Sequence, residues 1–314
     1  MATNKTTKKV AAAKSTPKKA AATTTKTTVT RTVSASATTN KARLDTSLPG
    51  NLINIILAEA IGTFVLTLVA VGATSYFMLP FYVGLTLVIM VLGIGAISGS
   101  HINPAVTFGL WSMRKLKTVL VPFYWAAQFL GAMAAVVLLG ALSGGAFAIH
   151  FNHFMEFSWG IFALELIGTA IFIFGLAAVI NRNDVKQTGK ALGIGLSLAI
   201  GLVATGSLLS YVQSSAVTKY QEEQAKVEQS GDATQQEGER TYPREVYIGG
   251  ATLHPAVAMA VTEKTDGQLQ GNPTVQKDEK AYTRLSLEVI LATLIGAAIG
   301  GNLFLLVNYR ARQS

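Results

Sequence analysis

The chain has 314 residues, of which 50% are hydrophobic and 14% charged, with a net charge of +9 and a positive mean hydropathy. This composition is typical of a polytopic membrane protein and excludes an ordinary soluble globular domain. The absence of cysteine excludes disulfide bonds, thiol catalysis and thiolate metal sites.

Residues 1–48 form a basic segment rich in Lys, Thr, Ala and Ser. Ten Lys or Arg residues stand against the single acid Asp45, so this segment carries a charge equal to that of the whole chain. With almost no large apolar side chains it cannot bury a core, and we predict a disordered cytosolic tail. Three roles stay open: a solubilising tail near anionic lipid, an acid-poor transit peptide, and an arm that binds anionic lipid or nucleic acid.

Residues 49–314 form the predicted membrane domain. Six apolar stretches are long enough to span a bilayer, at about 52–74, 81–97, 118–140, 160–180, 190–210 and 286–308. Glu59 lies inside the first stretch, and Glu165 takes the same place in the fourth. Ionisable groups at membrane depth usually have a role. We expect both carboxylates to accept hydrogen bonds from irregular backbone nearby, because a proton relay would need further titratable side chains at helical spacing.

The segment Ser98-Gly-Ser-His-Ile-Asn103-Pro104-Ala105-Val-Thr107 stands between apolar runs. Asn is a favoured N-cap and Pro a favoured first residue of a helix. The pattern predicts a short re-entrant helix whose positive end lies inside the membrane. An ordinary Asn-Pro turn between two spans fits the same local spacing.

Basic residues between and after the spans cluster on one side. They follow the first short helix, flank the turn after the fourth span, and close the chain at Arg114, Lys115, Lys117, Arg182, Lys186, Lys190, Arg310 and Arg312. The opposite loops, 75–80 and 141–159, contain no Lys or Arg. The positive-inside rule therefore predicts that both termini are cytosolic.

Two polar insertions, at about 211–248 and 262–284, fall on the outer side and flank a second short motif. We expect both insertions to be exposed, and one hypothesis has them capping an outer opening. The second motif, Gly250-Ala-Thr-Leu-His254-Pro255-Ala256-Val257, repeats the frame of Gly99 to Val106.

Other pairs repeat in the same order along the chain: Glu59-Ala-Ile-Gly-Thr63 with Glu165-Leu-Ile-Gly-Thr169, Gly84-Leu-Thr-Leu87 with Gly195-Leu-Ser-Leu198, and Gly131-Ala132 with Gly296-Ala297. Each half has three spans, an odd number, so the halves must insert with opposite topology. The sequence thus predicts an inverted repeat with its site between the halves.

These motifs resemble the aquaporin, or major intrinsic protein, family over roughly residues 50–310. The resemblance implies an all-α membrane fold with six transmembrane helices and two re-entrant half-helices, assembled as a homotetramer in the lipid bilayer. It implies passive passage of water or small neutral solutes without a cofactor. It also implies that Asn103 donates a hydrogen bond to the permeating molecule, while the half-helix dipoles repel cations.

The second motif departs from the family pattern, which has Asn in place of His254 and Arg in place of Val257. The other positions of the family's selectivity constriction correspond to Val83, to Gly201 or Leu202, and to Ala251. This ring is small and apolar, so we expect glycerol- or urea-sized solutes to pass as well as water. Two hypotheses for His254 stay open: a neutral donor whose protonation in acid alters conduction, and a structural helix cap.

We therefore expect a passive channel for water or small neutral solutes. The alternative is a non-conducting scaffold with the same fold, whose basic tail tethers a polyanion. An enzyme is disfavoured, because the sequence offers no nucleophile–base set, metal cluster or phosphate-binding loop.

Overall fold

The computed structural model of the chain describes residues 47–72, 77–144, 149–230, 242–271 and 280–311. Of the basic tail predicted over residues 1–48, residues 1–46 lie outside the described residues. Residues 231–241 and 272–279 of the two polar insertions also lie outside them.

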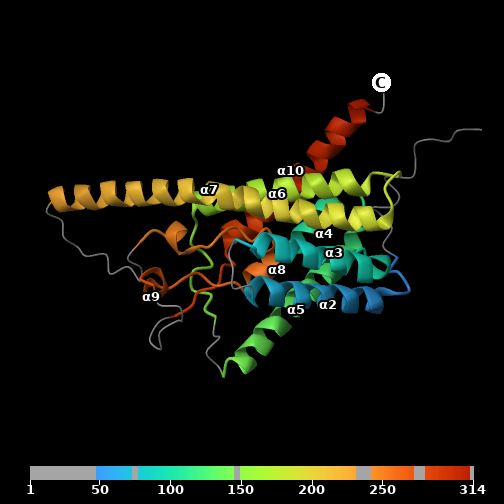
Figure 1. The fold of residues 1–314 in the computed structure, drawn as a ribbon, viewed down its shortest axis with the longest axis horizontal. Coiled ribbons are helices and arrows are strands. Elements are labelled where there is room, and N and C mark those ends of the chain that lie inside the picture. The colour runs from blue at the N-terminus through green and yellow to red at the C-terminus, as the bar shows by residue number, and fades with distance from the viewer. Residues whose placement is uncertain (1–46, 73–76, 145–148, 231–241, 272–279, 312–314) are drawn as a thin grey trace, which may run out of the picture. The chain divides into compact units, whose positions relative to one another are not determined.

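Regular structure in the described residues is helical, with two isolated β-bridges and no strand. In chain order the helices are α2 (Leu52–Gly72), α3 (Leu79–Ser98), α4 (Pro104–Ser112), η1 (Thr118–Leu120), α5 (Val121–Leu142), α6 (Trp159–Ile180), α7 (Gln187–Ser230), η2 (Arg244–Tyr247), α8 (Pro255–Ala258), α9 (Asp266–Leu269) and α10 (Leu287–Ala311). Figure 1 shows the long helices gathered in a bundle, with the short α4 and α8 among them.

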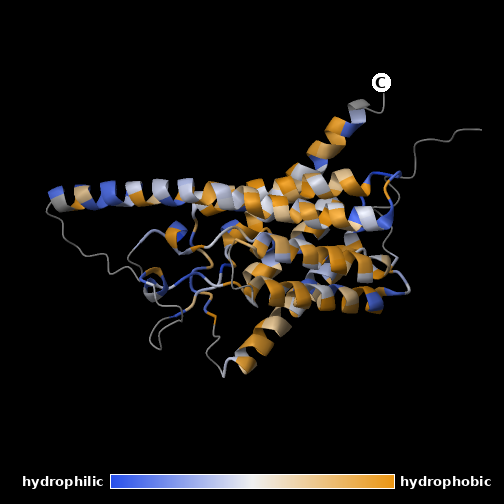
Figure 2. Ribbon diagram, in the orientation of Figure 1, coloured by the Kyte–Doolittle hydropathy of each residue, from blue (hydrophilic) through white to orange (hydrophobic). Residues whose placement is uncertain are grey.

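Six helices are long and apolar enough to cross a membrane: α2, α3, η1 with α5, α6, α7 and α10. Figure 2 shows that hydrophobic residues cover these helices along the bundle. Many large apolar side chains point outward, as expected of helices whose solvent is lipid. The six predicted spans are confirmed, and the chain is a multi-pass membrane protein.

The helices form two halves of like design. In the first half α2 packs against α3 and α5, and in the second half α6 packs against α7 and α10. The α3–α7 contact joins the halves. Each short helix also contacts the opposite half of the chain: α4 packs on α10, whereas α8 contacts α2 and α5.

Repeated glycines make equivalent close contacts in the two halves. A Cβ on Gly131 would lie 2.2 Å from the carbonyl oxygen of Ala60, and one on Gly296 would lie 2.5 Å from that of Leu166. Between the halves, a Cβ on Gly195 would come within 2.3 Å of the Gly84 oxygen. Small residues let membrane helices approach this closely, so the sequence repeat is matched by a structural one.

The helix α7 continues about twenty residues beyond the predicted span, to Ser230. This outer part is hydrophilic in Figure 2, and its residues from Gln221 to Lys226 are exposed. Good helix formers dominate it, and Glu222 precedes Lys226 by one helical turn. These features explain why α7 continues past residue 210, where the span predicted from hydropathy ends.

The expectation that both polar insertions are exposed is wrong for three of their charged residues. Arg244, Glu263 and Arg284 are almost completely buried. Burial is tolerated here because these side chains form ion pairs with one another or with the acids of the helices. The insertions therefore belong partly to the packed interior.

Candidate functional site

The two short helices begin in the same way. Asn103 has an extended backbone, and its Oδ1 accepts a hydrogen bond from the Ala105 N–H at 2.8 Å. His254 also has an extended backbone, and its Nδ1 accepts from the Val257 N–H at 3.1 Å. A proline follows each cap. Each motif is therefore an N-cap followed by a proline at the first helical position.

The two caps also hold each other. The Asn103 Nδ2 donates to the Leu253 carbonyl oxygen at 3.0 Å, and the His254 Nε2 lies 2.6 Å from the Ile102 carbonyl oxygen. Because Nδ1 of His254 accepts from Val257, Nε2 must carry the proton and act as donor. The N-termini of α4 and α8 thus meet inside the bundle through reciprocal hydrogen bonds.

The residue before each cap has a left-handed backbone. Ile102 has a φ of 39° and Leu253 a φ of 54°, which are unusual for bulky side chains. Such a conformation costs on the order of 1–3 kcal/mol and persists only where its surroundings hold it. Here the opposite cap binds the carbonyl oxygen of each strained residue.

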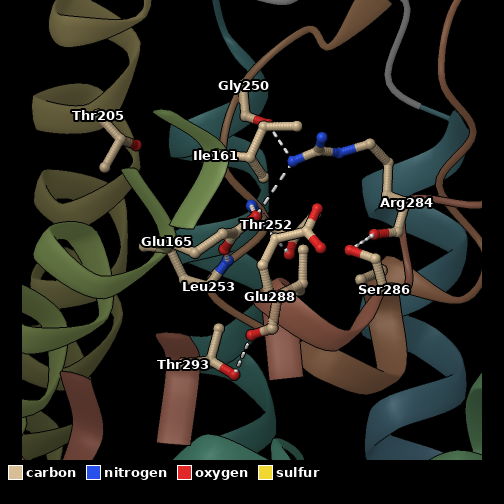
Figure 3. A network of polar contacts seen from close by, with 12 residues as sticks. Ile161, Glu165, Thr205, Gly250, Thr252, Leu253, Arg284, Ser286, Glu288 and Thr293 are labelled. Atoms are coloured by element: carbon tan, nitrogen blue, oxygen red, sulfur yellow. Dashed lines mark hydrogen bonds and ion pairs between the residues drawn. The ribbon is translucent and has the colours of Figure 1, made fainter. Parts of the chain in front are cut away.

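Two buried carboxylates hold the backbone ahead of the caps. Glu59 accepts from the backbone N–H groups of His101 and Ile102, at 2.9 and 2.6 Å. Glu165 accepts from those of Thr252 and Leu253, at 2.8 and 2.7 Å (Figure 3). Both side chains are 0% exposed. Equivalent acids therefore hold equivalent loops in the two halves.

Further polar residues support the first loop and were not identified from the sequence. Gln128 donates to Glu59 at 2.9 Å and to the Thr107 hydroxyl at 3.0 Å. The Tyr124 hydroxyl donates to the Ser98 carbonyl oxygen at 2.5 Å, and its ring stacks on His101. Gln128 is a polar residue within a predicted span, and that is the signal that could have revealed it.

A cavity of about 180 Å³ lies beside the second motif. Its lining includes Val83, Leu202, Ala251 and Val257 of the proposed constriction, together with His254. Since a liquid water molecule occupies about 30 Å³, several waters fit. The structure thus brings these four constriction candidates to one space.

Of the two alternatives on α7, Leu202 lines the cavity and Gly201 does not. A Cβ on Gly201 would lie 2.8 Å from the Gly168 carbonyl oxygen and 3.0 Å from the Leu253 side chain. Gly201 therefore serves the packing of α7 against α6, and Leu202 is the one of the two alternatives that borders the cavity. Consecutive helical residues face different directions, so only one of the pair can point into the cavity.

One wall residue of this cavity, Arg284, belongs to a set of buried ion-paired residues. Arg284, one of the lining residues, donates through Nη2 to Glu165 and to the Gly250 carbonyl oxygen, both at 3.2 Å (Figure 3). Arg244 pairs with Glu263 at 2.5 Å and with Glu288. Glu165 was expected from the sequence to be a site residue. The other four ion-pairing residues were not.

The environment shifts the pKa values of the two arginines in opposite directions. Burial disfavours the charged form of Arg244, but the carboxylates of Glu263 and Glu288 hold its pKa above the ordinary value. Burial lowers the pKa of Arg284, and Glu165 opposes that effect. An arginine stays protonated in proteins at neutral pH, so both remain cations.

Within the described ranges, no group of three or more His, Asp or Glu side chains is arranged to hold a metal ion. What the site offers is two helix N-termini, apolar walls and a few polar groups around a small cavity. This combination suits the passage of small polar molecules rather than covalent chemistry.

Six membrane-spanning helices with two re-entrant helices capped against each other define a class of membrane protein built on an inverted repeat. The profile of the major intrinsic protein family matches residues 50–211. The chain belongs to this family.

Individual relatives extend this result. The chain is 33% identical over 162 residues to Aquaporin NIP2-3 of Zea mays, across 48% of this chain and 53% of that protein. It is 30% identical over 195 residues to Aquaporin Z of Photorhabdus laumondii, across 53% of this chain and 84% of that protein. The match thus spans about half the length of the plant relative.

Among solved structures, the X-ray structure of the aquaglyceroporin from Plasmodium falciparum is similar, with 20% sequence identity and a TM-score of 0.46. The alignment covers 81% of this chain and 93% of that one.

Proposed function

We propose that this protein is a passive channel for water and small neutral solutes of glycerol or urea size. The observation that carries the proposal is the cavity lined by Val83, Leu202, Ala251 and Val257, which reaches His254 at the junction of the two half-helices. Major intrinsic proteins are channels rather than enzymes, and the names of the relatives above agree with a water or solute pore.

Asn103 is the proposed central donor. One of its two amide hydrogens goes to Leu253, which leaves the other for a passing molecule. A neutral imidazole has one N–H group, and in His254 that group goes to Ile102. His254 therefore acts as a structural cap in this proposal, and the centre of the pore offers fewer donors than two asparagines would.

The apolar lining favours permissive solute selection. Val257 and Ala251 present only small hydrocarbon surfaces to the cavity, so they set a size limit and impose little hydrogen-bond matching. Selectivity in such a pore follows from its diameter, its donors and its electrostatic barriers. We infer that glycerol-sized molecules pass along with water.

Stopped-flow light scattering on proteoliposomes tests this function. Vesicles are challenged first with an impermeant sugar, to measure water efflux, and then with glycerol or urea, to measure solute entry. We expect both processes to be faster than in empty vesicles. Rates equal to those of empty vesicles, for water and for both solutes, would contradict the proposal.

The alternative of a non-conducting scaffold has no support from the comparisons. A homotetramer with one pore per subunit, cytosolic termini and a tail that binds anionic lipid or nucleic acid complete the proposed arrangement. Cross-linking in detergent tests the assembly, and protease protection of a tagged terminus in oriented vesicles tests the topology.

A further inference from the structure

Arg284 is an unusual component of the cavity wall. It lies in the segment before α10 and is 1% exposed, yet it lines the cavity beside the second motif. Figure 3 shows its guanidinium directed toward Gly250 and Glu165, which lead into and support the α8 loop. A full positive charge is therefore held at fixed geometry next to Ala251 and Val257.

The hydrogen-bonding capacity of Arg284 is only partly used. Nη2 donates to Glu165 and Gly250. In the part of the chain that the structure describes, Nε and Nη1 are buried and have no hydrogen-bond partner. Leaving charged donors unsatisfied is costly, so these N–H groups call for an acceptor. Neither atom has surface open to the cavity that Arg284 borders, so water or a solute oxygen reaches them only when the side chain turns toward that cavity.

The charged side chains that line the cavity are basic, whereas the acids that pair with the two buried arginines do not line it. Among the described lining residues, Arg284 and Lys264 are basic and none is acidic. The nearby carboxylates have other partners: Glu165 also binds the N–H groups of Thr252 and Leu253, and Glu263 and Glu288 pair with Arg244. A small cation in the cavity would therefore meet the guanidinium before any carboxylate.

We propose that Arg284 is a specificity-determining residue of the outer cavity, whose free N–H groups bind the oxygen of a passing neutral solute and whose charge bars cations. The inference rests on the proposed channel function. Val257 carries no charge. The inference assigns the fixed positive charge of the cavity to Arg284, 27 positions further along the chain.

The decisive variant is Arg284→Met, which removes the charge and keeps an unbranched side chain. Thr252 and Leu253 still offer their N–H groups to Glu165 in this variant, whereas the carboxylate loses its ion-pair partner, so folding is checked first. Arg182→Met is the matched control, because Arg182 is an exposed arginine in the turn between α6 and α7 and pairs with Asp184, two residues away. Monodisperse elution and thermal melting check that both variants fold.

Proton leak is measured with an internal pH dye under a potassium diffusion potential, alongside water efflux in the same vesicles. Removing a unit charge from the cavity wall should raise the leak about tenfold or more in Arg284→Met. Arg182→Met should behave as the unaltered protein does. A water-conducting Arg284→Met protein with unchanged leak would overturn the inference alone.

A second variant keeps the inference testable if Arg284→Met does not fold. Arg284→Lys retains the charge but loses the planar set of donors, so we expect a low proton leak with slowed glycerol entry. Unchanged glycerol entry in this variant would overturn the donor role. Failure of the unaltered protein to conduct water or solute would instead refute the channel function, and the inference with it.

Discussion

At the scale of single residues, His254 caps α8 with both of its ring nitrogens engaged. Its ring replaces both structural contacts of an asparagine cap: Nδ1 accepts from Val257 and Nε2 donates to Ile102. What the ring lacks is a second N–H group. The neutral ring thus leaves no N–H group free where the two short helices meet.

The first prediction concerns His254→Asn. The amide can keep the cap and the contact with Ile102, and it adds one N–H group for permeating water. A hydrogen bond contributes about 0.5–1.5 kcal/mol, so we expect water permeability per protein to rise by about two- to tenfold. Stopped-flow efflux normalised to reconstituted protein measures it, and an equal or lower permeability would count against a donor-poor centre.

The same geometry predicts that conduction is insensitive to mild acid. Protonation would place a hydrogen on Nδ1 of His254 and break its bond with the Val257 N–H. The neutral ring is therefore favoured, and water permeability should stay constant between about pH 5 and pH 7, in the interval where an unperturbed histidine titrates. A pH-dependent change that disappears in His254→Asn would instead support protonation-controlled conduction.

Val257 offers a test of how the outer cavity selects solutes. Val257→Arg adds bulk and a second guanidinium near Arg284, and the two like charges repel. We expect glycerol entry to slow by about tenfold, equivalent to about 1.4 kcal/mol on the barrier, while water still passes. Val257→Leu is the control for bulk alone, and equal glycerol rates in both variants would remove charge from the explanation.

At the scale of elements, the two half-helices depend on buried carboxylates for their position. Glu59 and Glu165 each accept hydrogen bonds from two consecutive backbone N–H groups. Membrane interiors offer no free water to such groups. The loops before α4 and α8 can be irregular only because the carboxylates are there.

Glu59→Ala should therefore destabilise the protein strongly. It leaves the N–H groups of His101 and Ile102 buried without an acceptor, at about 1–3 kcal/mol each. Thermal unfolding in detergent should show a clearly lowered midpoint. Glu222→Ala, which removes an exposed acid from the outer part of α7, is the control and should leave the midpoint unchanged.

Some elements could be predicted from the sequence and others could not, for physical reasons. The six spans follow from hydropathy, and both short helices follow from the cap-proline pattern, because those signals are local. The continuation of α7 to Ser230 depends on helix propensity in polar sequence, which hydropathy does not detect. The choice between Gly201 and Leu202 required the rotation of α7, which no local pattern fixes.

The buried ion pairs were missed for a related reason. Arg244 and Arg284 stand in polar sequence that reads as exposed, and their partners Glu165, Glu263 and Glu288 are distant along the chain. Only the tertiary fold brings these charges together. The burial of a charged residue in such an insertion therefore cannot be predicted until its ion-pair partners are known.

At the scale of the whole molecule, the distribution of charge separates the two proposed roles, solute passage and polyanion binding. Residues 1–45 carry a formal charge of +9, equal to that of the entire chain, so the membrane domain and its loops balance to zero. A neutral domain suits a channel for uncharged solutes. The concentrated basic charge of the tail suits contact with a polyanion, whether lipid headgroups or nucleic acid.

Deleting residues 1–45 should separate these roles. Water permeability should be unaffected, whereas binding to duplex DNA or to anionic vesicles should be lost. If all ten basic side chains contact phosphates of a duplex, the logarithm of the binding constant falls against that of salt with a slope of up to about −9. Salt titration of the full chain measures this slope, and the deleted protein should show almost none. Binding that survives the deletion with the same slope would place the polyanion site in the membrane domain and its loops, whose basic clusters include Arg114, Lys115 and Lys117.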